Sequence, residues 1–219
     1  MDTSGQSTLS IVAALVVLVA FLQIGVRLLA LPTSRRGAPV LALVVTIVIG
    51  VPSLLQLVWP AVGEALSRDP AATLERGEWW RVLTALLAQD GGVLAIVFGL
   101  VVVAVATGIS ERIWGRPLAL ALFLLPSIAV NLLAVLVWRA PGGGSSFASD
   151  GLMASVAALG LLTGGRLASP WRVIVPVLSG VVILAGVVLV VAGDAHGVAI
   201  LIGAALGLLA APVRMRRRA

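Results

Sequence analysis

The chain has 219 residues, of which 60% are hydrophobic and 11% are charged, whereas a soluble domain is about 45–50% apolar and about 25% charged. This composition indicates an integral membrane protein. The absence of cysteine excludes disulfides, and one histidine excludes a conventional His/Cys metal site, so no metal or other cofactor is expected. The net charge of +6 suits anionic lipid, and no nucleic-acid-binding pattern accompanies it.

Seven segments meet or nearly meet the length of about 20 mostly apolar residues that a membrane-spanning helix needs. The first lacks the basic flank of a signal peptide and is expected to be retained. The sequence therefore predicts an all-α polytopic membrane protein with about seven spans. In chain order they are Leu9–Leu31, Val40–Val62, Val82–Ile109, Pro117–Val137, Gly151–Leu167, Trp171–Ala192 and His196–Val213.

All fifteen basic residues are arginine, which favours a bacterial source, and their placement predicts the orientation. We expect a cell-membrane protein with its N-terminus outside and its C-terminus in the cytoplasm. Outside, the arginines are then Arg68, Arg76, Arg81 and Arg139. Inside, they are Arg27, Arg35, Arg36, Arg112, Arg116, Arg166, Arg172, Arg214, Arg216, Arg217 and Arg218.

The loop Gly63–Arg81 is too long for a simple turn and contains the aromatic pair Trp79 and Trp80. Amphipathic aromatic rings collect at the level of the lipid headgroups. We therefore expect a structured segment that lies in the membrane interface.

His196 is the only histidine, and it stands at the start of the last predicted span. A glycine-rich outer loop leads into a helix predicted to begin near Ser149. A serine hydroxyl is a weak nucleophile unless a base removes its proton, and imidazole is the side chain suited to that task near neutral pH. Small residues on the face of His196 would let the two helices approach closely; they are Ala199, Gly203 and Gly207.

Each of these features also has a purely structural interpretation. A serine at a helix start is most often an N-cap, and Ser145 and Ser146 are expected in the loop. Asp150 and Asp194 favour the positive ends of helix dipoles, although Asp194 could instead orient the imidazole of His196.

Four stretches, in this order, resemble rhomboid intramembrane serine proteases. GEWWRVLTALL (Gly77–Leu87) is similar to the entry into the family's second core helix, with Trp80 and Arg81. ERIWG is similar to the Glu-x-Arg-x-Gly loop, with Glu111, Gly115 and an arginine, Arg112, one place early. FASDGLMA resembles the Gly-x-Ser-Gly segment and maps the nucleophile to Ser149. AHGVAILIG closely resembles the segment that carries the general base, which maps to His196.

The resemblance implies a six-helix core plus one extra N-terminal transmembrane helix. The expected organisation is an extra helix and inside loop at 1–37, a rhomboid-like core at 38–213 and a basic cytoplasmic tail at 214–219. The implied activity is a serine endopeptidase that cleaves transmembrane or juxtamembrane segments of membrane proteins with a Ser149/His196 dyad. The alternative is a non-catalytic relative that binds transmembrane helices. Either way, the expected partners are membrane proteins and the lipid bilayer.

The sequence departs from the family pattern at positions that bear on catalysis. Phe147 and Asp150 stand where the family has glycines beside the serine, and Met153 replaces an aromatic residue that is frequent four places after it. The side chains that stabilise the family's oxyanion have no counterpart at Leu94 or Ala95, nor at Phe98 or Gly99. Backbone N–H groups at Ser149 and Asp150, or the side chain of Gln89, are the expected substitutes.

Overall fold

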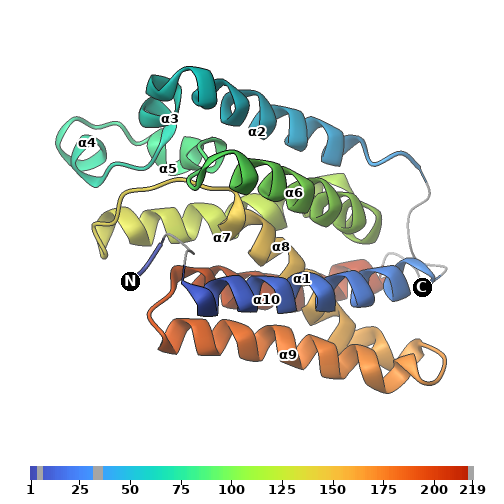
Figure 1. Ribbon diagram of the computed structural model, residues 1–219. Coiled ribbons are helices and arrows are strands. Elements are labelled where there is room, and N and C mark those ends of the chain that lie inside the picture. The colour runs from blue at the N-terminus through green and yellow to red at the C-terminus, as the bar shows by residue number, and fades with distance from the viewer. Residues whose placement is uncertain (4–6, 32–36, 217–219) are drawn as a thin grey trace.

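The computed structural model describes residues 1–3, 7–31 and 37–216, and its architecture is a bundle of long helices (Figure 1). Seven helices in this described part are long and apolar enough to cross a membrane, which confirms the predicted class. They are α1 (Thr8–Leu29), α2 (Val40–Val58), α6 (Gly92–Trp114), α7 (Arg116–Leu136), α8 (Ser146–Thr163), α9 (Trp171–Val191) and α10 (Ala195–Arg216). The start of α1 and the end of α10 lie at opposite ends of the bundle (Figure 1).

Helix α8 is the central element of the bundle. It contacts α1, α6, α7, α9 and α10, and nearly all of its residues are buried. Its apolar side chains join those of α1 and α7 in one core that includes Phe21, Phe123 and Leu159. Because five long helices contact α8, residues at its first turn can meet groups from several parts of the chain.

Two predicted helix starts are wrong. The third span begins at Gly92 rather than Val82, because Gly91 and Gly92 have positive φ angles of 95° and 76° that interrupt a helix. The residues before this break form α5 (Arg81–Thr84) and the short 3₁₀ helix η1 (Ala85–Leu87). The central helix begins at Ser146 rather than near Ser149, so Ser146 is not a loop residue.

The long loop is structured, as predicted. It contains α3 (Pro60–Leu66) and α4 (Pro70–Glu75), each with a proline in its first turn. Arg68 lies between these two helices in the same loop and is buried; it donates to the carbonyls of Ala140 (2.8 Å) and Pro141 (3.1 Å), and bonds the Asn131 side chain. Burial lowers the pKa of Arg68 to about 10. This arginine fastens the loop to the segment that leads into α8.

The aromatic pair and its arginine lie at the surface of this loop. Trp79 and Trp80 are exposed, while Arg81 bonds Glu78 (2.5 Å) and the backbone carbonyls of Glu64 and Ser67. Arg81 therefore holds the loop together.

Glu111 fixes the C-terminal end of α6, which runs from Gly92 to Trp114. Its buried carboxylate accepts hydrogen bonds from the backbone of Ala42 and from Arg116 (2.8 Å), whereas Arg112 is exposed. Among the described residues, Glu111 therefore pairs with Arg116 and not with its neighbour Arg112. Gly115 joins α6 to α7 with φ of 83°, a conformation that suits glycine.

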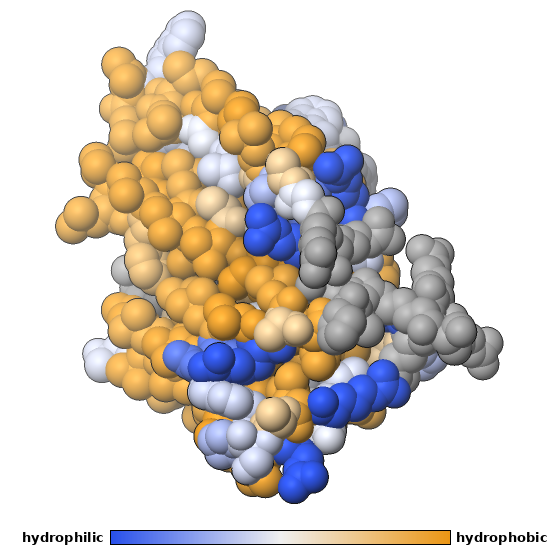
Figure 2. All heavy atoms as spheres, turned by 90° about the vertical axis from the view of Figure 1, so that its right-hand side faces the viewer, coloured by the Kyte–Doolittle hydropathy of each residue, from blue (hydrophilic) through white to orange (hydrophobic). Residues whose placement is uncertain are grey.

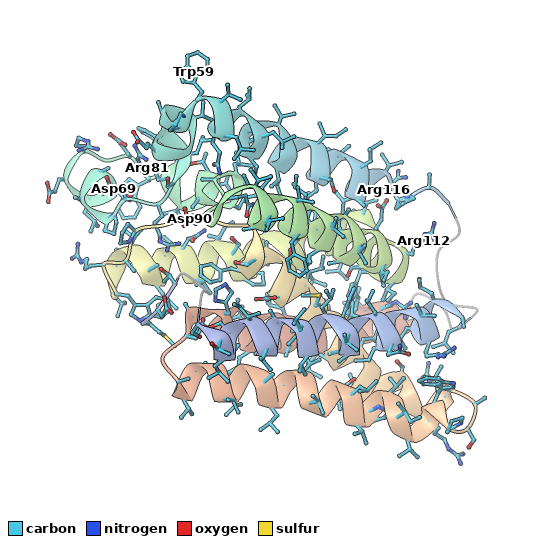
Figure 3. All side chains as sticks on the ribbon, viewed as in Figure 1. Trp59, Asp69, Arg81, Asp90, Arg112 and Arg116 are labelled. Carbon is cyan, nitrogen blue, oxygen red and sulfur yellow. The ribbon has the colours of Figure 1, made fainter. Side chains whose placement is uncertain are left out.

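Charged side chains gather at the two ends of the bundle. Figure 2 shows hydrophilic side chains at the end of the bundle where α10 ends. Figure 3 places Arg112 and Arg116 there, and Asp69, Arg81 and Asp90 at the other end. Four of the arginines on which the predicted orientation rests lie outside the described residues: Arg35, Arg36, Arg217 and Arg218. Part of the predicted basic tail lies outside them as well.

Candidate catalytic site

His196 contacts a serine at the end of the bundle where α8 and α10 begin. Its Nε2 lies 3.0 Å from the Oγ of Ser146, the first residue of α8. His196 itself is the second residue of α10, so both side chains project from helix starts. Ser146 is exposed, whereas the imidazole is partly buried. This geometry is that of a nucleophile paired with a general base.

The predicted hydrogen bond between Ser149 and His196 is wrong. The Ser149 side chain lies one turn deeper in α8, where its buried hydroxyl has no hydrogen-bond partner among the described residues. Ser145 precedes the helix and accepts a hydrogen bond from the side chain of Gln89 at 2.9 Å. Of the three serines, Ser146 is therefore the one that His196 can activate.

Asp194 binds the other side of the imidazole. Its Oδ1 lies 2.7 Å from Nδ1 of His196 and 2.8 Å from the backbone nitrogen of the same residue. A carboxylate is an acceptor only, so Nδ1 carries the proton and Nε2 is free to accept from Ser146. The interpretation of Asp194 that the sequence left open, orientation of the ring, agrees with this geometry.

The charge of Asp194 is maintained despite its burial. Burial disfavours the ionised carboxylate, but hydrogen bonds from His196 and Ser10, together with the nearby imidazole, hold the pKa of Asp194 below its ordinary value of 3.8. An ionised Asp194 can stabilise an imidazolium as it forms.

A cavity of about 310 Å³ opens in front of the pair. Ser146 and His196 lie on one side of it with Gly143 and Gly144, and its other walls are largely apolar. Those walls come from α1 (Ile11, Ala14, Leu15, Leu18) and α6 (Ala95, Phe98, Gly99, Val102). A peptide segment in this cavity would lie directly against the serine hydroxyl.

The α6 wall offers no side-chain hydrogen-bond donor. Ala95, Phe98 and Gly99 face the cavity, while Leu94 does not line it and is 85% exposed. The side chain of Gln89 reaches this region, since its Oε1 lies 3.6 Å from where a Cβ of Gly99 would be. Gln89 therefore occupies space beside the position that a side chain from α6 would fill.

The first turn of α8 supplies backbone donors instead. The first N–H groups of a helix have no intrahelical acceptor, and Ser146 and Phe147 are the first two residues here. Ser149 already donates to the carbonyl of Ser145. Asp150, the fifth residue, lies within the helical hydrogen-bond ladder, so its predicted role as a backbone donor does not agree with the structure.

An aromatic side chain contacts the imidazole from an unexpected position. The ring of Phe147 lies 4.7 Å from that of His196, tilted by 55°, so an aromatic contact exists at the residue after Ser146. Met153 is buried and lines the cavity. Asp150 also lines it, is only 7% exposed, and makes no hydrogen bond through its carboxylate within the described part of the chain.

Glycines bring α8 and α10 close enough for the pair to form. A Cβ at Gly203 would overlap the backbone of Gly151, and one at Gly207 would lie 2.5 Å from the carbonyl oxygen of Ser155. Ala199 is fully buried on the same face. The close approach predicted from these small residues is present.

The fold and the site together define a class of protein: a polytopic membrane protein in which a serine and a histidine lie side by side at the starts of two helices. The sequence profile of the rhomboid domain matches residues 76–217, more than half of the chain. The chain therefore belongs to the rhomboid family, as the resemblance indicated. Comparisons with curated proteins and with solved structures gave no match. The matched range begins at residue 76, so α1 and α2 lie outside it.

The family motif also fits Ser146 better than Ser149. Gly144 stands two places before Ser146, which satisfies the Gly-x-Ser part of Gly-x-Ser-Gly, whereas Phe147 precedes Ser149. A Cβ at Gly144 would lie 3.5 Å from the Ser146 hydroxyl. A glycine at this position thus keeps one side of the hydroxyl open. This spacing is the signal that the sequence interpretation missed.

Proposed function

We propose that this protein is an intramembrane serine endopeptidase in which Ser146 is the nucleophile and His196 the general base. The observation that carries the proposal is the 3.0 Å contact between Ser146 Oγ and His196 Nε2 beside the cavity. His196 takes the hydroxyl proton as Oγ attacks the peptide carbonyl, and then gives that proton to the leaving amine. A water molecule, activated by the same imidazole, hydrolyses the acyl-enzyme.

The tetrahedral intermediate needs donors for its oxyanion. The backbone N–H groups of Ser146 and Phe147 stand at the positive end of the α8 dipole, which favours a developing negative charge. The amide of Gln89 lies beside them. These three groups support catalysis in place of the absent side chains on α6.

The substrates that we propose are transmembrane or juxtamembrane segments of other membrane proteins. The apolar walls of the cavity suit such segments. We also propose that the site lies at the outer face, because arginines lie at the end of the bundle opposite the site: Arg112 in α6, Arg214 in α10, and Arg166 in the short 3₁₀ helix η2 (Gly164–Arg166) that follows α8. The chain has no cysteine, so single cysteines at Ser4 and Ala219 would report the orientation by labelling from one side of the membrane.

The test of the proposed activity is labelling of the full chain in detergent by a fluorophosphonate. The wild-type protein should label, and Ser146→Ala and His196→Ala should not. Ser145→Ala and Ser149→Ala are matched controls in the same segment, and both should label. Labelling that survives Ser146→Ala but is lost in Ser149→Ala would restore the nucleophile first predicted and contradict the present proposal.

A non-catalytic protein that binds transmembrane helices is the second candidate. The observation that favours it is the lack of a side-chain donor at Ala95 and Gly99. A folded wild-type protein that neither labels nor cleaves peptides would support this function. The cavity would then serve as a binding site only.

A further inference from the structure

The N-terminal helix reaches the catalytic pair although it lies outside the matched rhomboid domain. Ser10, in the first turns of α1, is 5% exposed and donates its hydroxyl proton to Oδ2 of Asp194. Oδ1 of the same carboxylate binds His196. The two oxygens of Asp194 are thus divided between α1 and the imidazole.

The direction of the hydrogen bonds in this chain of contacts is determined. Because the carboxylate only accepts, the single proton of the Ser10 hydroxyl points to Asp194. Ser7 Oγ lies 2.5 Å from Ser10 Oγ and must therefore be the donor in that contact. Ser7 also caps α1 by accepting from the backbone nitrogen of Ser10 at 3.0 Å. The helix cap and the catalytic carboxylate are parts of one network.

A second contact from the N-terminus holds the same segment. The backbone nitrogen of Asp2 donates to the carbonyl of Gly193 (2.7 Å), and Ala195 donates to the carbonyl of Asp2 (2.8 Å). These bonds attach the chain on both sides of Asp194. The loop that presents Asp194 and His196 is therefore tied to the N-terminal region twice.

The packing of α1 sets the position of Ser10. Phe21 and Ile24 are fully buried in the core. A Cβ at Gly25 would lie 2.7 Å from Ile109 of α6, and Arg27 stacks on Trp171 of α9 at 3.7 Å. Helix α1 is thus packed against α6 and α9, and in this position Ser10 lies beside Asp194.

We infer that α1 is part of the catalytic centre and that Ser10 is a positioning residue, which acts on His196 through Asp194. The matched rhomboid domain alone lacks this contact. For activity the inference rests on the proposed serine endopeptidase function. It predicts that loss of one hydroxyl on α1 slows catalysis but leaves the binding of substrate in the cavity unchanged.

The experiment compares three variants of the full chain in detergent. Ser10→Ala removes the donor, Ser10→Thr keeps a hydroxyl, and Thr8→Ala is the control at an exposed position of the same helix. Ser10→Ala should lower kcat and the fluorophosphonate labelling rate about tenfold, the scale of a hydrogen bond to a charged group, with KM unchanged. Ser10→Thr should recover most of the rate, and Thr8→Ala should match the wild type.

A spectroscopic measurement makes the inference independent of activity. Since the chain has one histidine, ¹⁵N-histidine labelling gives signals of His196 alone. The Nδ1 proton bonded to Asp194 should shift or exchange faster in Ser10→Ala but not in Thr8→Ala. An unchanged Nδ1 signal in a folded Ser10→Ala protein would overturn the inference. If the wild type does not label with fluorophosphonate, the proposed activity fails, and this spectrum still decides the role of Ser10.

Discussion

Gly203→Ala tests whether the contact of α8 with α10 brings together Ser146 and His196, the proposed catalytic pair. The new Cβ would lie 2.5 Å from the carbonyl carbon of Gly151, whereas carbon atoms in contact are about 3.5–4.0 Å apart. The obstacle is backbone and cannot rotate away, so the helices must separate by about 1 Å. Overpacking of this kind costs about 1–3 kcal/mol of unfolding free energy.

The same displacement moves His196 away from Ser146. A misplacement of about 1 Å can lower a catalytic rate by about 100-fold, so we expect the labelling rate to fall more than the stability indicates. Thermal unfolding and fluorophosphonate labelling in detergent measure the two effects. Gly180→Ala in α9 is the matched control, because a Cβ there meets no atom within 4 Å. Wild-type stability and labelling in Gly203→Ala would refute the reasoning.

Three further predictions concern the carboxylates and the α6 wall. Because the folded pKa of Asp194 is below 3.8, its stabilising effect is present above that pH and is lost as the pH falls through the folded value. The difference in unfolding free energy between wild type and Asp194→Asn should therefore close at acidic pH, and a difference independent of pH would contradict this. Asp150→Asn should raise the unfolding free energy by about 1 kcal/mol, since a buried unpaired charge is costly; lower stability would mean that the carboxylate has a partner. Gly99→Asn adds a side-chain donor to the cavity and should raise the peptide cleavage rate about tenfold; an unchanged rate would mean that Gln89 and the backbone donors already stabilise the oxyanion fully.

The sequence predicted the spans well because apolar length is a direct signal of membrane insertion. Six of the seven predicted spans begin within five residues of the observed helices. The error at Val82 arose because Val82–Leu87 is apolar enough to resemble the start of a span. The break lies at Gly91 and Gly92, where two positive φ angles interrupt the helix. Asp90 followed by two glycines is a turn signal that could have marked it.

The sequence suggested that Asp194 could orient the imidazole of His196, but it could not predict Ser10 of α1 as the second partner of Asp194. Ser10 and Asp194 are 184 residues apart, and no local pattern connects them. Their contact depends on α1 packing between α6 and α9, which requires the three-dimensional arrangement of helices. The buried environment of Asp150 is likewise a property of the assembled bundle.

The choice of Ser149 over Ser146 failed because helical phase does not distinguish them. The two serines are three residues apart and lie on nearly the same face of α8, so a stripe argument fits both. What separates them is depth, about 4.5 Å at 1.5 Å per residue. His196 is the second residue of α10 and Ser146 the first of α8, so two helices that begin at one end of the bundle bring these side chains to the same level. Ser149 lies one turn deeper and is 2% exposed; it lines the cavity, but its hydroxyl makes no hydrogen bond to the imidazole or to any other described residue. A catalytic pair built from two helix starts must therefore match in depth as well as in face, and the glycine two residues before Ser146 marks the level at which the hydroxyl stays open.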